Sequence, residues 1–140
     1  MSRTDKAFWV TVIPIVVLWN TVRVPLLSRM GEVFGFEVVP PTAGLVIGNL
    51  VVGCVLAAAA GYAAARIAAP KRIGAGINVA IGVTIAFGLQ NFIEYRQAGV
   101  STLYFAAVPL LAALAAVAGS VLSSLSRAGY WSRGSHRDDG

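Results

Sequence analysis

The stretch that decides the fold is residues 43–65, AGLVIGNLVVGCVLAAAAGYAAA, which contains no charged side chain. A helix rises about 1.5 Å per residue, so about 20 such residues span roughly 30 Å, the thickness of the hydrocarbon core of a bilayer. A helix also pairs its backbone polar groups internally, as lipid requires. The stretch therefore predicts a membrane-spanning helix.

Three further apolar runs are about as long, at about residues 7–27, 73–92 and 103–125, and of these only the first contains a charged residue, Arg23. Over the whole chain 57% of the residues are hydrophobic and only 12% are charged, whereas soluble domains carry about 25% charged residues. So few charges cannot cover a surface that faces water. The sequence therefore predicts an all-α membrane protein, a four-helix transmembrane bundle.

Turn-forming residues between the apolar runs set the expected domain organisation. Pro41 precedes the second run, Pro70 the third and Gly99 the fourth, and such residues mark short connections. We expect residues 1–6 to form an N-terminal segment and residues 7–126 a single transmembrane domain. We expect residues 127–140 to form a polar, disordered tail.

The distribution of Lys and Arg predicts which way the chain crosses the membrane. Most of the 11 Lys and Arg residues lie on the side that holds both termini: Arg3, Lys6, Arg66, Lys71, Arg72, Arg127, Arg133 and Arg137. The other side holds only Arg23, Arg29 and Arg96. Because cytoplasmic segments carry the excess of positive charge, we expect both termini in the cytoplasm. The expected location is the plasma membrane, and more narrowly a bacterial inner membrane.

Small residues at four-residue spacing indicate how the helices pack, because close approach of backbones holds helices together in lipid. The candidate packing residues are Gly44, Gly48, Gly53, Ala57 and Gly61 in the second run and Gly82 in the third. We expect the second and third spans at the centre of the bundle. The same small residues can alternatively form a dimerisation face between two chains.

A group of polar side chains falls in the half of the bundle that faces away from the termini, the outer leaflet of the predicted topology. Its candidate members are Asn20 and Arg23 in the first span, Asn49 in the second, and Gln90, Asn91 and Glu94 in the third. A charge within a span normally faces the bundle interior or pairs with an opposite charge. We predict that Arg23 pairs with Glu94 while the four amides hydrogen-bond around them. In the alternative, both charges lie at the water boundary and extend outward.

Basic residues gather near the predicted cytoplasmic end of the bundle. Arg66 ends the second run one turn after Tyr62, and Lys71 and Arg72 begin the third. Such residues bind the headgroups of anionic lipids, and we predict that contact here. In the alternative, they serve only to fix the orientation of the chain.

The residues of common catalytic and cofactor sites are absent from the spans. His136, the only histidine, lies in the polar tail, and Cys54, the only cysteine, lies inside an apolar run. The spans therefore lack the histidine ligands that a His-based metal site or a haem group needs. They also hold no pair of carboxylates. We expect no enzyme activity and no cofactor. Nucleic acid is not an expected partner, because the basic residues are dispersed along the chain.

These patterns favour a small non-catalytic integral membrane protein that acts as an accessory or structural component. Its expected partners are the lipid bilayer and either a second copy of itself or a larger membrane protein. The alternative function is an oligomeric small-solute channel or transporter, with the outer polar cluster at its mouth. The two functions differ in whether solute crosses a reconstituted membrane.

Overall fold

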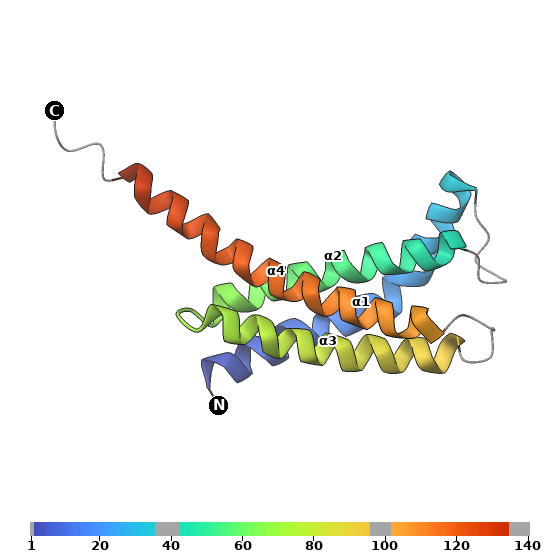
Figure 1. Ribbon diagram of the computed structural model, residues 1–140, viewed down its shortest axis with the longest axis horizontal. Helices are drawn as coiled ribbons and strands as arrows, with labels where there is room; N and C mark the ends of the chain where they lie inside the picture. The colour runs from blue at the N-terminus through green and yellow to red at the C-terminus, as the bar shows by residue number, and fades with distance from the viewer. Residues whose placement is uncertain (1, 36–42, 96–101, 135–140) are drawn as a thin grey trace.

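The structure, a computed structural model, describes residues 2–35, 43–95 and 102–134, and within them the side chains of 2–35, 46–93 and 106–126. These residues form four helices, α1 (Arg3–Phe34), α2 (Ala43–Ile67), α3 (Arg72–Tyr95) and α4 (Thr102–Gly134), packed into an elongated bundle (Figure 1). Each helix is long and apolar enough to cross a membrane. The prediction of an all-helical chain with four candidate spans is therefore confirmed.

Helix α1 begins and ends at local signals. The Ser2 hydroxyl accepts a hydrogen bond from the Asp5 N–H (3.1 Å), and the Asp5 carboxylate accepts one from the Ser2 N–H (2.9 Å), which together form a capping box. Gly35 ends the helix with a φ of 72°, a left-handed conformation that glycine adopts without strain. Residues 3–6, expected to precede the first span, therefore form its first turn.

Helix α4 continues well past the apolar run. It ends at Gly134, so residues 127–134 are helical and the expectation of a disordered tail over 127–140 is wrong for this part. Residues 135–140 lie outside the described residues. The physical reason is that polar side chains mark where a helix leaves lipid, not where the helix ends, and no proline follows Pro109 to break it.

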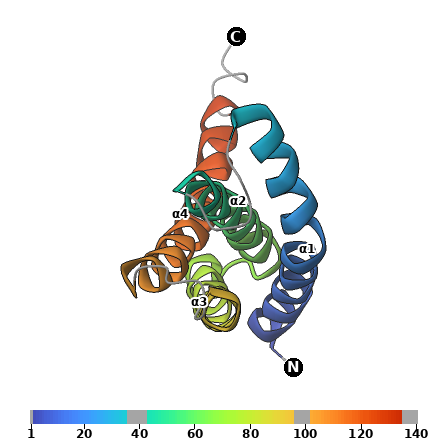
Figure 2. The same ribbon diagram turned by 90° about the vertical axis from the view of Figure 1, so that its right-hand side faces the viewer.

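Helices α2 and α3 form the centre of the bundle, as expected. Each contacts all three other helices, whereas within the described ranges α1 and α4 do not contact one another and lie on opposite sides (Figure 2). Helices α1 and α3 run in one direction, and α2 and α4 in the other (Figure 1). The N-terminus and the connection between α2 and α3 consequently lie at the same end of the bundle.

The closest approach of two helices joins α2 to α4. A Cβ atom built at Gly61 would overlap the backbone carbonyl oxygen of Ala116, and one at Gly119 would overlap the carbonyl oxygen of Ala58. Each helix therefore presents an alanine carbonyl to a glycine of the other, and the backbones touch directly. Contact between α2 and α4 is also the most extensive in the bundle.

The other small residues predicted to pack do so against several helices. Gly53 faces Trp19 of α1, Gly82 faces Phe8 of α1, and Ala57 is fully buried. Gly48 is buried as well, while the surroundings of Gly44 lie outside the described side chains. The small residues of α2 from Gly48 to Gly61 are thus buried within a single chain, where they let α1, α3 and α4 approach.

Candidate functional site

An aromatic stack lies next to the predicted polar cluster, on the side nearer the middle of the bundle. Trp19 of α1 lies on Phe87 of α3 with ring centroids 4.3 Å apart and an angle of 19° between the planes, and both side chains are fully buried. Gly53 of α2 makes room for the stack, because a Cβ there would lie 3.3 Å from the Trp19 ring. One residue from each of three helices therefore fixes this level of the bundle.

Arg23 lies one turn beyond Trp19 on α1 and turns into the bundle. Its side chain is only 5% exposed, and the guanidinium carbon lies 5.1 Å from the centroid of the Trp19 ring. This is a cation–π contact, which strengthens when water is excluded. Glu94 belongs to α3, but its side chain lies outside the described residues, so the pairing of Arg23 with Glu94 stays a prediction.

Asn49 and Asn91 form a buried amide pair between α2 and α3. The Asn49 Nδ2 group donates to the Asn91 Oδ1 atom at 3.4 Å, and both side chains are fully buried. The Asn91 Nδ2 group and the Trp19 Nε1 group, also buried, have no hydrogen-bond partner in the described part of the chain. Buried donors without acceptors are uncommon. The layer formed by Trp19, Asn49 and Asn91, here called the polar layer, therefore contains buried polar groups whose hydrogen bonding is incomplete.

Asn20 and Gln90 form a second amide pair, on the outside of the bundle between α1 and α3. The Gln90 Nε2 group donates to Asn20 Oδ1 at 2.6 Å, and Asn20 Nδ2 donates to the backbone oxygen of Val16 at 2.8 Å. Asn20 is exposed and Gln90 is half-buried. The four amides predicted to cluster are thus divided into an inner pair and an outer pair at the level of Arg23.

An apolar core separates this polar layer from the opposite end of the bundle. Its members come from all four helices, and those that are fully buried include Ala7, Ala57, Ala64, Val79, Val83, Phe87, Ala112 and Ala116. Trp19 closes the core on the side of the polar layer. At this level the described side chains in the interior of one chain are apolar and buried, and the polar layer ends there.

The contribution of Trp19 and Phe87 is the part of this site that sequence reasoning missed. Trp19 did carry a signal, because a tryptophan in the middle of a span fits neither interfacial belt. Phe87 carried none, since a phenylalanine in a run of apolar residues is ordinary. Their stacking depends on how α1 is rotated against α3, which one helix alone does not encode.

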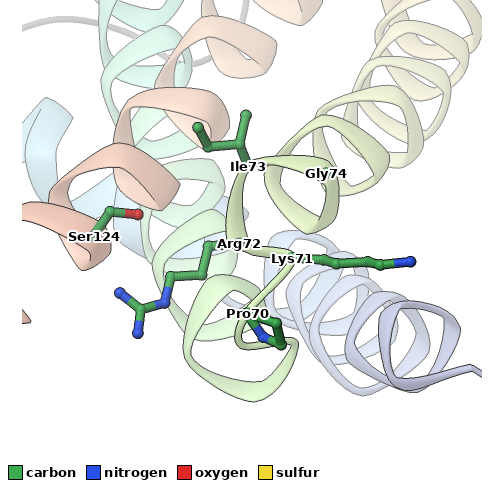
Figure 3. Close-up of a pocket in the computed structure, with 6 residues that line it drawn as sticks. All are labelled: Pro70, Lys71, Arg72, Ile73, Gly74 and Ser124. Atoms are coloured by element: carbon green, nitrogen blue, oxygen red, sulfur yellow. The ribbon is translucent and has the colours of Figure 1, made fainter.

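The basic residues at the other end of the bundle do not form one cluster. The guanidinium of Arg66 lies over its neighbour Tyr62, 5.6 Å from the ring centroid, and is exposed. Lys71 and Arg72 line an open cavity of about 590 Å³ between the start of α3 and the later part of α4. In Figure 3 Arg72 extends to the side where Ser124 of α4 lies, whereas Lys71 extends the opposite way.

Neither region carries the residue set of a familiar cofactor or metal site. Among the described residues no three His, Cys, Asp or Glu side chains gather to hold a metal ion, and His136 lies outside them. Comparison with protein-family models, with curated proteins and with solved structures finds no match for the chain.

Proposed function

We propose that this chain is a non-catalytic integral membrane protein that acts as an accessory or structural component, packing against a second copy of itself or a larger membrane protein. The observation that carries the proposal is the amide pair of Asn20, which is exposed, and Gln90, which is half-buried. Their side chains lie on the outer surface of two apolar helices, joined at 2.6 Å. Polar groups in contact with lipid are unfavourable and normally face protein, so a partner that covers this pair relieves the exposure.

The filled interior of the bundle supports an accessory function over conduction through one chain. Trp19 and Phe87 are fully buried, and Val83 and Val79 continue the apolar core away from the polar layer. A solute path through a single chain would need water or polar groups along its length. A pore between several chains is the second candidate, since the amides of Asn20 and Gln90 then face water.

We further propose that both termini lie in the cytoplasm and that the membrane is the plasma membrane, in a bacterium the inner membrane. The excess of Lys and Arg on the side of the termini supports this orientation. It places the amide pairs in the outer half of the bilayer and Arg72 at its inner surface. The partners of the chain are then lipid and other membrane-embedded protein.

A photo-crosslinking experiment in native membranes tests the surface at Asn20. A photoreactive amino acid at position 20 is expected to give adducts with protein, either a second copy or a larger chain. The matched control is position 110 on α4, where Leu110 is 60% exposed and only lipid adducts are expected. Lipid adducts alone from position 20 would refute the packing surface.

A flux measurement separates the two candidate functions. The purified protein, reconstituted in liposomes, is expected to leave the leakage of small ions and neutral solutes at the level of empty vesicles. Flux that rises with the amount of protein, and falls when Asn20→Leu removes the exposed amide, would replace the accessory function with the channel. Thr21→Val is the control, because the Thr21 hydroxyl donates to the Val17 oxygen of its own helix (2.8 Å).

A further inference from the structure

An open cavity lies at the end of the bundle that carries the connection between α2 and α3. It has a volume of about 590 Å³ and is lined by Pro70, Lys71, Arg72, Ile73, Gly74 and Ser124. Five of these residues belong to the connection and the first turn of α3, and Ser124 comes from α4 (Figure 3). The cavity is large enough for the headgroup of a phospholipid, and it opens to the outside of the bundle.

The polar side of the cavity can bind an anion. Arg72 is half-buried, and its side chain lies on the side of the cavity where Ser124 is found (Figure 3). The Ser124 hydroxyl donates to the backbone oxygen of Ser120 at 3.2 Å, a long bond for an O–H donor. It can rotate toward a better acceptor, and a guanidinium and a hydroxyl that line one cavity are suitable donors to phosphate oxygens.

The apolar side of the cavity distinguishes a lipid from a free ion. Ile73 lines the cavity and is 56% exposed, and Ile77 and Ile81 follow at intervals of one turn with exposed fractions of 47% and 55%. Residues four apart share a helix face, so an apolar strip leads from the cavity along α3 toward the middle of the bundle. A ligand that fills both parts has a charged head and a hydrocarbon chain.

We infer that this cavity binds the phosphate group of an anionic phospholipid, with Arg72 and Ser124 holding the phosphate and an acyl chain lying along Ile73 and Ile77. Arg72 is the basic residue assigned to the phosphate, because its side chain lies on the Ser124 side of the cavity whereas Lys71 extends the opposite way (Figure 3). Arg66 does not line the cavity and rests on Tyr62. The site is independent of the protein partner proposed above, because it lies at the other end of the bundle.

The test measures lipid binding by the full chain in mild detergent. Native mass spectrometry and thermal unfolding are followed while phosphatidylglycerol, phosphatidylcholine or inorganic phosphate is added. Phosphatidylglycerol is expected to bind and to raise the melting temperature more than the other two. Arg72→Gln is expected to weaken that binding by about fivefold, the effect of one basic residue near an anionic lipid.

The control is Arg66→Gln, which removes the same charge at the same end outside the cavity and is expected to leave binding unchanged. Ser124→Leu, which fills the cavity from α4 without changing charge, is also expected to weaken binding. This second variant tests the site even if Arg72→Gln does not fold. Equal losses from Arg66→Gln and Arg72→Gln would overturn the site in favour of diffuse attraction. Equal stabilisation by inorganic phosphate or by phosphatidylcholine would overturn the assignment to an anionic lipid.

Discussion

Gly61 of α2 and Ala116 of α4 meet backbone to backbone, with no space for a side chain between them. The relationship is repeated in reverse one turn along each helix, where Gly119 of α4 meets Ala58 of α2. Two alanine carbonyls and two glycines thus form a reciprocal contact between helices that run in the same direction (Figure 1). Contacts of this kind hold helices together in lipid, where burying apolar surface gives no advantage.

Gly61→Ala is expected to destabilise the bundle, although alanine is favoured over glycine in a helix by about 1 kcal/mol. The added methyl group must push α4 away from α2, and overpacking of this kind costs about 1–3 kcal/mol. Unfolding in detergent, followed by circular dichroism, measures the difference. Gly74→Ala is the control, because nothing lies within 4 Å of a Cβ at Gly74, and a stability loss as large in Gly74→Ala would contradict the explanation.

Trp19→Ala is expected to lower stability far more than Trp9→Ala. Trp19 is fully buried against Phe87, whereas Trp9 is 53% exposed. Removing a buried tryptophan leaves a cavity and costs about 3–5 kcal/mol, and here it also removes the ring beneath Arg23. The two variants are compared by thermal unfolding at the same lipid content, and equal losses would show that Trp19 is not a packing residue.

Asn49→Leu and Asn91→Leu are expected to be non-additive. Each single change removes the hydrogen bond between the two buried amides, at about 1–3 kcal/mol, and the second change then has no such bond left to remove. The double variant is therefore expected to be less destabilised than the sum of the two single variants. Strict additivity in urea or detergent unfolding would show that the 3.4 Å contact contributes nothing.

Arg23→Gln and Glu94→Gln test the predicted ion pair. If Arg23, which is 5% exposed, is paired with Glu94, either single change removes the same interaction and the double change adds little. A coupling energy of at least about 1 kcal/mol is expected from the double-mutant cycle. Additive losses of stability would refute the pairing.

The proposed orientation predicts which residues a membrane-impermeant maleimide reaches in intact cells. In a Cys54→Ser background, a cysteine introduced at Thr42 is expected to be labelled from outside. A cysteine introduced at Ser135 is expected to react only after the cells are opened. Labelling of Ser135→Cys in intact cells would invert the topology and place Arg72 at the outer surface.

The number and approximate position of the helices were predictable, because each apolar run is long enough to cross a bilayer by itself. Asn20 and Asn49 could likewise be assigned to one half of the bundle from helix geometry alone. What could not be predicted is which side chains meet across helices. Asn20 contacts Gln90 while Asn49 contacts Asn91, a division set by how far each helix is rotated about its axis.

The close contact between α2 and α4 could not be predicted from the sequence for a related reason. Both helices contain many small residues, and an alanine-rich chain offers several faces on which close approach is sterically allowed. Gly61 and Gly119 form the contact because the two helices cross where both lack a Cβ. The crossing point depends on all four helices at once.

The hydrogen bond from Gln90 to Asn20 joins residues 70 positions apart, and this separation has a consequence for synthesis. When the first helix reaches the bilayer, the third has not yet been made, and Asn20 has only the oxygen of Val16 in its own helix to bond to. Arg23 at that stage lacks the burial that α2 and α3 later provide. The first helix thus exposes more polar surface to lipid in the growing chain than in the finished bundle. This exposure favours holding it beside the insertion machinery until the third helix arrives.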